Sequence, residues 1–203
     1  MNPRILTHLS QDLKLAQIIP NIALSEIDIH NDIYFDLLQS IVSQQLSIKA
    51  AATIFGRFLA LFPDKNPAPS VIIDMDMELL RSSGLSGQKA GYITNIARYW
   101  MDHKDMNQDW INTDDDTIIK ELKSIKGVGK WTVQMILMFR LGRLDVFPID
   151  DLGIRQGMIG LYELEGKTGK ELIREMNRIA ESWKPYRSVA SRYIWKWKDG
   201  NKK

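Results

Sequence analysis

The residues of this 203-residue chain that could bind an anion cluster around two glycines. The stretch "SIKGVGKWTVQM", residues 124–135, places Gly127 and Gly129 between two helical segments, with Lys126 and Lys130 beside them. Glycine permits positive φ and close approach of a backbone, and the start of the second helix offers unpaired N–H groups at the positive end of its dipole. With the lysines, the natural anion is a nucleic-acid phosphate. A glycine cap followed by a turn glycine is the alternative that the tripeptide alone leaves open.

The elements that must position these residues are helical almost throughout. Apolar residues recur at three- and four-residue spacing over 33–46, and Ser47 is expected to cap the next helix, which stops at Pro63. The stretch "TGKE", residues 168–171, has the form of a capping box, and Pro185 sits where a first helical residue belongs. Sustained apolar/polar alternation is absent. The pattern predicts an all-α chain of about ten helices.

Composition narrows the classes of function. The chain is 44% hydrophobic with a net charge of +2, so its overall charge says little about partners. It has no cysteine, which excludes disulfides, thiolate zinc sites, iron–sulfur clusters and cysteine nucleophiles. Its three histidines lie far apart, which disfavours a histidine metal centre. The first twenty residues lack a long apolar core, and no stretch has membrane-span length, so we expect a soluble, intracellular protein without a signal peptide.

Taken whole, "LKSIKGVGKWT", residues 122–132, resembles the hairpin of the helix-hairpin-helix DNA glycosylases, whose Gly/Pro-containing loop ends in an essential Asp. The stretch "GRLDVFPIDDLGIRQG", residues 142–157, is similar to that loop and its Asp. Two further stretches, "SIVSQQLSIKAA" at 40–51 and "ESWKPYRSVASRYIWKW" at 181–197, resemble the branch that excises alkylated bases, of the DNA-3-methyladenine glycosylase II type. The resemblance covers most of the chain, from about residue 33 to residue 198.

The resemblance implies hydrolysis of an N-glycosidic bond in DNA after the damaged nucleotide is flipped out of the duplex. The motif assigns the catalytic carboxylate to Asp151, which would stabilise an oxocarbenium-like transition state and position or deprotonate a water. An Asp at a helix start is favoured by the helix dipole and is expected to remain ionised. Asp150 is assigned the N-cap of that helix. Without the motif, the sequence would predict only N-cap roles for Asp150 and Asp151.

The flipped base needs a pocket in which it can stack. Alkylated purines are electron-poor or cationic, so aromatic faces attract them. The resemblance places the pocket tryptophans at Trp131 and Trp195, with Tyr34 and Met135 as further lining. The alternative is that both tryptophans belong to the core, as most of the six in the chain must.

Base flipping also requires a wedge residue that fills the space left in the base stack, and residues that bind the phosphates of the bent DNA backbone. The resemblance places the wedge at Gln45, with Leu46 as the second choice, although two adjacent glutamines alone read as exposed helix-end amides. A second contact region is "GLSGQK", residues 84–89, at a helix start. The predicted phosphate-binding residues are Gly127, Gly129, Lys126, Lys130, Thr132, Ser86 and Lys89. Lysines at helix ends usually only complement the dipole, and any phosphate contact predicts salt-sensitive binding.

The reaction type depends on one position in the hairpin. Bifunctional relatives, which also nick the strand, carry a Schiff-base lysine immediately before the hairpin threonine, and here that position is Trp131. Lys130, one position earlier, should point elsewhere on the helix. We therefore expect a monofunctional enzyme that leaves an abasic site. The resemblance requires no cofactor or catalytic metal and allows a structural monovalent cation at the hairpin carbonyls.

The expected architecture is two helical lobes with a DNA-binding cleft between them. Residues 38–146 would form the lobe with the wedge and the helix-hairpin-helix, and residues 1–37 with 147–203 the lobe with the catalytic Asp. The expected partner is double-stranded DNA containing damaged bases, bound by a monomer. The protein would be cytoplasmic and nucleoid-associated in a prokaryote, or nuclear in a eukaryote.

Three other hypotheses stay open from the sequence. The chain could be a glycosylase for deaminated or etheno purines, a helix-hairpin-helix DNA-binding module without catalysis, or an all-α interaction protein. A DNA-binding module without catalysis would need none of Asp151, Trp131 and Trp195. The hypothesis of an interaction protein would not explain the glycine hairpin. Gly153 and Gly157 weaken the helix after Asp151; packing could compensate, or the glycines could admit another helix closely.

Overall fold

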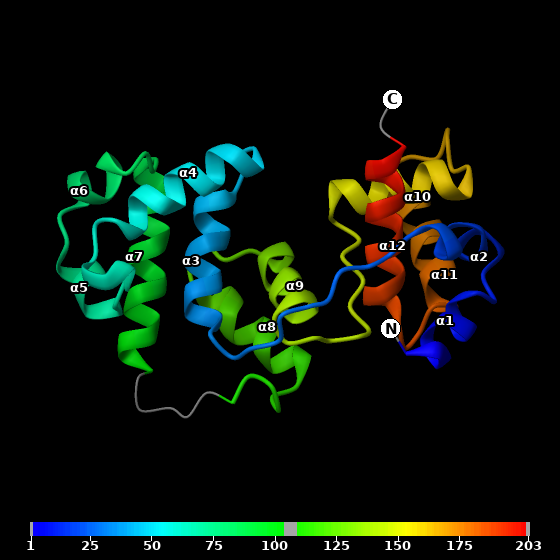
Figure 1. Ribbon diagram of the computed structural model, residues 1–203, viewed down its shortest axis with the longest axis horizontal. Helices are drawn as coiled ribbons and strands as arrows, with labels where there is room; N and C mark the ends of the chain where they lie inside the picture. Colours follow the sequence, from blue (N-terminus) through cyan, green and yellow to red (C-terminus); the bar gives the residue numbers. More distant parts are fainter. Residues whose placement is uncertain (1, 104–108, 202–203) are drawn as a thin grey trace. The chain divides into compact units, whose positions relative to one another are not determined.

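All regular structure in the described part of the chain is helical. The computed structural model describes residues 2–103 and 109–201, in which twelve α-helices and two short 3₁₀ turns follow one another (Figure 1). The predicted all-α fold is confirmed, with more helices than the pattern predicted. Within the described residues, no helix combines the length and the hydrophobicity needed to cross a bilayer.

The chain divides into two compact units. One unit comprises residues 30–136, and the other comprises residues 1–29 and 137–203. The first unit starts and ends earlier than the predicted range 38–146. Helix α3, Ile33–Ser43, packs against α4 and α7 of that unit, and the division falls within α9, Lys130–Phe139.

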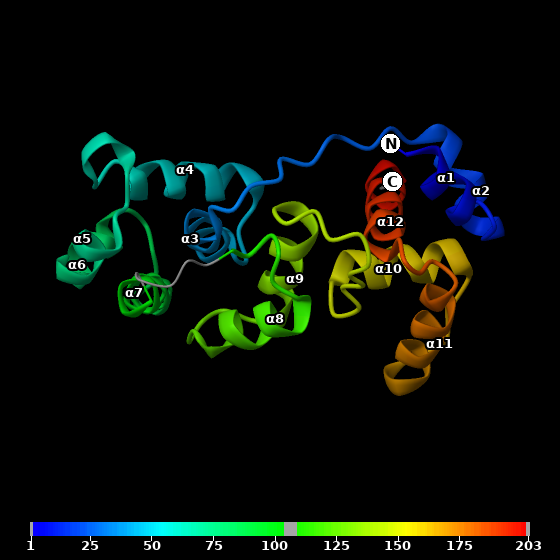
Figure 2. The ribbon, with the colours of Figure 1, turned by 90° about the horizontal axis from the view of Figure 1, so that it is seen from below.

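The unit of residues 30–136 is organised around its longest helix, α7. Helices α3, α5 and α6 pack against α7, and α3 also packs against α4. Figure 2 shows α3 and α7 nearly end-on, side by side. The side chains of Leu37, Phe58, Ile93 and Leu122 are fully buried. In addition to α3 and the start of α9, this unit contains α4 (Ile48–Leu59), η2 (Pro63–Lys65), α5 (Pro69–Asp74), α6 (Met77–Ser82), α7 (Gly87–Asp102) and α8 (Asp115–Ser124).

The unit of residues 1–29 and 137–203 has its own core. Helix α10 crosses α12, which also packs against α2 (Figure 1). Leu15, Ile154, Met158, Trp183 and Ile194 are buried in one hydrophobic cluster. The elements are α1 (Pro3–Leu9), α2 (Leu13–Ile18), η1 (Ile19–Asn21), the end of α9, α10 (Leu152–Tyr162), α11 (Gly169–Glu181) and α12 (Arg187–Gly200).

Helix starts follow the predicted caps in part. The Ser47 hydroxyl accepts the N–H of Ala50 at 3.3 Å, so the predicted cap of α4 is confirmed. The predicted capping box at α11 is wrong: the Thr168 side chain makes no cap hydrogen bond, and the Glu171 carboxylate accepts from the Lys167 ammonium at 2.7 Å instead of reaching back.

Two further helix boundaries differ from the sequence pattern. Helix α12 begins at Arg187, not at Pro185, because the N–H of Tyr186 closes a turn on the carbonyl of Trp183 at 2.7 Å. Helix α5, Pro69–Asp74, was not predicted at all. Six residues are too few to show a helical period.

Candidate functional site

Asp151 is held at the start of α10. Its Oδ1 accepts the backbone N–H of Ile154 at 2.8 Å, which makes Asp151 the N-cap. The prediction that Asp150 caps this helix is wrong, because the helix begins at Leu152 and the cap position therefore falls on Asp151. Asp150 instead accepts from the Arg155 guanidinium at 2.9 Å. The cap orients the Asp151 carboxylate at the positive end of the helix dipole.

Trp195 holds the same oxygen from another helix. Its indole Nε1 lies on α12 and donates to Asp151 Oδ1 at 2.8 Å. Hydrogen bonds to an ionised group are roughly twice as strong as neutral ones. The half-buried indole ring lies beside Phe139, with ring centroids 5.9 Å apart. Two residues that the resemblance named separately are therefore in direct contact within one unit.

The glycines of α10 explain how α12 comes so close. A Cβ at Gly153 would lie 2.9 Å from Asp151 Oδ1 and 2.9 Å from Nε1 and Cδ1 of Trp195. A Cβ at Gly157, one helical turn further, would lie 2.5 Å from Cγ2 of Ile194. Side chains at both positions would push α12 away. Of the two explanations left open by the sequence, close approach of another helix is confirmed.

The loop that leads to Asp151 is fastened to the same helix, α12. The Arg187 guanidinium donates to both carboxylate oxygens of Asp145, at 2.7 and 3.0 Å. Next to this pair, the N–H of Val146 donates to the Ser188 hydroxyl at 2.9 Å. A bidentate pair of this kind fixes direction as well as distance. Sequence reasoning did not single out these residues, because nothing in the sequence links an Asp and an Arg so far apart.

The hairpin lies in the other unit, between α8 and α9. Gly127 has φ of 108°, and a Cβ there would lie 2.2 Å from Cγ of Tyr92. The Asn95 side chain of α7 donates to the carbonyl of Lys126 at 3.1 Å, and Val128 is buried. These contacts fasten the hairpin to α7. The monovalent cation that the resemblance allows at its carbonyls stays a prediction.

Gly129 differs from Gly127. Its φ is not positive, and a Cβ there would face open space. Intramolecular packing therefore does not require a glycine at this position. Lys126 and Lys130 are exposed beside it, and Lys130 is the first residue of α9.

The other predicted contacts on α9 are unequally accessible. Trp131, in the first turn, is 42% exposed, whereas Thr132 is only 2% exposed and Met135 is partly buried. The Thr132 side chain is thus enclosed, and its predicted phosphate contact stays a prediction. Pocket roles for Trp131 and Met135 also stay predictions.

Tyr34 is half-buried and makes contacts within its own unit. Its hydroxyl donates to the carbonyl of Pro67 at 2.7 Å, and its ring lies 5.3 Å from that of Trp100. Burial, and then the charge of Asp32, raise the pKa of this hydroxyl. These contacts assign Tyr34 a structural role, and the predicted pocket role remains untested.

The predicted wedge lies in the turn between α3 and α4. Gln45 is exposed with φ of 58°, and Leu46 is 37% exposed.

The second predicted phosphate-binding region lies at the start of α7. There the Ser86 hydroxyl caps the helix by accepting the N–H of Lys89 at 3.2 Å. The Lys89 ammonium does not extend outward from α7: it donates to the carbonyls of Val42 and Gln44.

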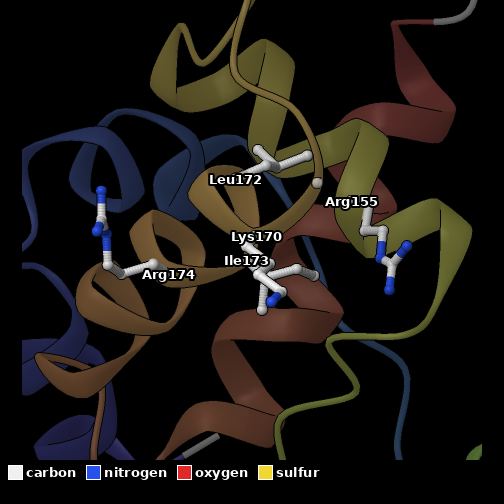
Figure 3. Close-up of a pocket in the computed structure, with 6 residues that line it drawn as sticks. Arg155, Lys170, Leu172, Ile173 and Arg174 are labelled. Atoms are coloured by element: carbon white, nitrogen blue, oxygen red, sulfur yellow. The ribbon is translucent and has the colours of Figure 1, made fainter.

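An open hollow on the unit of Asp151 does not form a convergent anion site. It is lined by Arg155, Gly169, Lys170, Leu172, Ile173 and Arg174. Figure 3 shows that Arg174 extends away from Arg155 and Lys170. The Arg155 guanidinium is already bonded to Asp150 and to the carbonyl of Ile149. Over residues 2–103 and 109–201, no group of three or more acidic, histidine or cysteine side chains could hold a metal ion.

The predicted site residues thus fall into two groups. Asp151 and Trp195 are in contact in the unit of residues 1–29 and 137–203. The hairpin, the wedge turn, Trp131, Met135 and Tyr34 all belong to the unit of residues 30–136.

Comparisons with known proteins identify the family of this all-helical chain. A family model described as "HhH-GPD superfamily base excision DNA repair protein" matches residues 38–185. This chain belongs to that superfamily.

Individual relatives agree with the family. DNA-3-methyladenine glycosylase 1 of Schizosaccharomyces pombe is 36% identical over 165 residues, which cover 80% of this chain and 71% of that protein. A solved structure of the 3-methyladenine DNA glycosylase of that yeast in complex with abasic DNA has a TM-score of 0.83 and 31% identity, and covers 95% of each chain. A DNA-3-methyladenine glycosidase of Bacillus halodurans has a TM-score of 0.82 and 32% identity, covering 97% of this chain and 89% of that one.

Proposed function

We propose that this chain is a monofunctional DNA glycosylase that excises alkylated purines, of the 3-methyladenine and 7-methylguanine type, from duplex DNA in base excision repair. The observation that carries the proposal is the Asp151 carboxylate, whose Oδ1 is held by the N–H of Ile154 and the indole of Trp195. The names of relatives 31–36% identical to this chain support the choice of substrate.

The chemistry assigned to Asp151 is electrostatic. As the bond between C1′ and the purine nitrogen breaks, its electron pair leaves with the base and positive charge develops on the sugar. A fixed carboxylate stabilises that charge most effectively because it does not have to reorganise. Water then adds to C1′ and loses a proton, which the carboxylate can accept. Alkylation makes the purine a good leaving group, so no strong acid is required.

The remaining roles follow the predicted sites. Trp131 and Trp195 offer aromatic faces to an electron-poor base, and Gln45 with Leu46 fills the space that the base leaves in the stack. Gly129 and the first turn of α9 bind a phosphate between Lys126 and Lys130. The open space in front of Gly129 supports this role, since no contact within the protein explains the glycine.

Release of the base is the only reaction proposed. The hairpin position of a Schiff-base lysine holds Trp131, so the product is an abasic site and the strand stays intact. No cofactor takes part, and the enzyme acts as a monomer on DNA, in the cytoplasm of a prokaryote or the nucleus of a eukaryote.

A lesion panel tests the proposed function. Duplexes that each contain one 3-methyladenine, 7-methylguanine, hypoxanthine or ethenoadenine are incubated with the protein and analysed with and without alkali. We expect release of the two methylated purines and strand breaks only after alkali. Breaks without alkali would contradict the monofunctional assignment. Release of hypoxanthine or ethenoadenine alone would change the substrate class, and binding to abasic DNA without any release would indicate a passive DNA-binding module.

A further inference from the structure

We propose that Lys89 is a positioning residue that holds the turn between α3 and α4 in the shape that a DNA wedge requires. Its ammonium nitrogen donates to the carbonyl of Val42 at 2.8 Å and to that of Gln44 at 2.7 Å. Lys89 lies in the first turn of α7, whereas Val42 lies in the last turn of α3 and Gln44 is the C-cap residue that follows this helix. The inference rests on the proposed function in one respect, the assignment of this turn as the wedge.

The carbonyl of Val42, in the last turn of α3, is one that a helix cannot pair by itself. The last carbonyls of a helix have no N–H partner within it, and they carry the negative end of the helix dipole. The Lys89 ammonium satisfies the Val42 carbonyl at this end, and it also bonds the carbonyl of Gln44, where the backbone has left the helix. Lys89 is partly buried, and burial lowers the pKa of its ammonium group. These observations fit a side chain directed into the protein.

The turn that Lys89 holds has an uncommon backbone. Gln45, directly after the bonded carbonyl of Gln44, has φ of 58°, a conformation that few residues other than glycine adopt. Such a conformation persists when neighbouring contacts enforce it. On one side the N–H of Leu46 donates to the carbonyl of Ser43 at 3.2 Å. On the other, Ser47 caps α4, and Lys89 supplies the contact from outside the turn.

The side chains displayed by this turn are suited to insertion between bases. Leu46 is 37% exposed, and Ile48, the first residue of α4, is 92% exposed. Apolar side chains inserted between base steps are a recurrent device for unstacking DNA. A turn that is rigid before it meets DNA loses little conformational freedom on insertion. Lys89 therefore promotes base flipping without touching the DNA.

The test compares Lys89→Met with Lys49→Met. Methionine keeps most of the stem and removes the ammonium group, and Lys49 is an exposed lysine at the start of α4 that controls for lost charge. Single-turnover release of 7-methylguanine is measured from a matched duplex and from a single strand. Because flipping limits only the duplex reaction, we expect Lys89→Met to slow it about tenfold and the single-strand reaction less than about twofold. The Lys49→Met variant should not alter the ratio of the two rates.

Other outcomes would overturn the proposal. An equal loss on both substrates would indicate a general structural effect. An equal loss together with a fall of about one in the salt slope of DNA binding would identify Lys89 as a phosphate contact, as the sequence predicted.

A second measurement does not depend on catalysis. In Lys89→Met without DNA, hydrogen exchange at the amide of Leu46 should become faster, while the thermal unfolding transition keeps its cooperativity. Unchanged exchange would overturn the positioning role. Faster exchange in a protein whose parent releases no alkylated base would support the role of Lys89 and refute the proposed function alone.

Discussion

At the scale of residues, the carboxylate of Asp151 is oriented by two N–H donors from different elements. The N–H of Ile154 belongs to the helix that Asp151 caps, and the indole of Trp195 belongs to α12. Gly153 lies between them, and its missing Cβ leaves the space through which the indole reaches the carboxylate. Gly153, a residue without a functional group, is therefore expected to matter for catalysis.

Gly153→Ala tests this assignment. Alanine raises helix propensity by about 1 kcal/mol, but its Cβ must displace Trp195 or the Asp151 carboxylate. We expect base release to fall at least about tenfold, because misplacement of a catalytic group by an ångström can slow a reaction a hundredfold. The measurement is single-turnover release of 7-methylguanine, together with binding to abasic DNA, which should persist.

The same helix offers matched controls. A Cβ at Gly160 would lie 3.4 Å from Trp197, an ordinary contact, so Gly160→Ala should stabilise α10 by up to about 1 kcal/mol and leave base release unchanged. A Cβ at Gly157 would overlap Ile194, so Gly157→Ala should lower the free energy of unfolding by about 1–3 kcal/mol. If Gly153→Ala releases base at the parent rate, the close approach of Trp195 does not matter for catalysis.

At this scale, the sequence did not determine the exact residue at which a helix begins. The motif selected Asp151, but the cap was assigned to Asp150, because a pattern does not show on which residue a helix begins. The structure combines the cap and the predicted catalytic role in one residue. For Gly153 the sequence offered close approach of another helix as one explanation, but it could not identify the partner, because Trp195 lies more than forty positions away in the chain.

At the scale of elements, α12 joins three parts of the predicted catalytic unit. It carries Trp195, and its first turn holds the loop before Asp151 through Arg187 and Ser188. It also packs against α10 and α2. Helix α12 therefore positions both the Asp151 carboxylate and the loop that precedes Asp151.

The hairpin allows a separate prediction, because its two glycines serve different purposes. Alanine at position 127 must adopt a positive φ and overlap the ring of Tyr92. We expect Gly127→Ala to lower the free energy of unfolding by at least about 2 kcal/mol, measured by denaturant titration.

Gly129→Ala is the paired variant. Its Cβ meets open space, so the free energy of unfolding should stay within about 0.5 kcal/mol of the parent. The added methyl group stands where the phosphate is proposed to approach, and affinity for abasic duplex DNA should fall about tenfold. Unchanged affinity in the folded variant would place the phosphate elsewhere.

Local signals explain which elements could be predicted from the sequence. The cap at Ser47 and the hairpin glycines are recognisable because their chemistry is complete within a few residues. The helix start after Pro185 and the side chain of Thr168 were predicted wrongly, because a turn at Trp183 and an ion pair at Glu171 override the local preference. Lys89 was predicted to face phosphate, but its carbonyl partners are more than forty residues away.

At the scale of the whole molecule, the two units carry different proposed tasks. Residues 30–136 contain the hairpin, the wedge turn and Lys89, which serve binding and distortion of DNA. Residues 1–29 and 137–203 contain Asp151 and Trp195, which serve bond cleavage. Substitutions in the first unit should therefore change DNA binding or base flipping, whereas substitutions at Asp151 should change bond cleavage alone.

The most direct test of this division compares Asp151→Asn with Asp150→Asn, two isosteric changes at adjacent positions. Single-turnover release of 3-methyladenine and binding to abasic duplex DNA are measured for both variants and the parent. We predict that Asp151→Asn lowers the release rate at least about a hundredfold and leaves abasic-DNA binding within about threefold of the parent, because asparagine offers no negative charge to stabilise the transition state. Asp150→Asn should retain both properties. Release at the parent rate by Asp151→Asn would contradict the account.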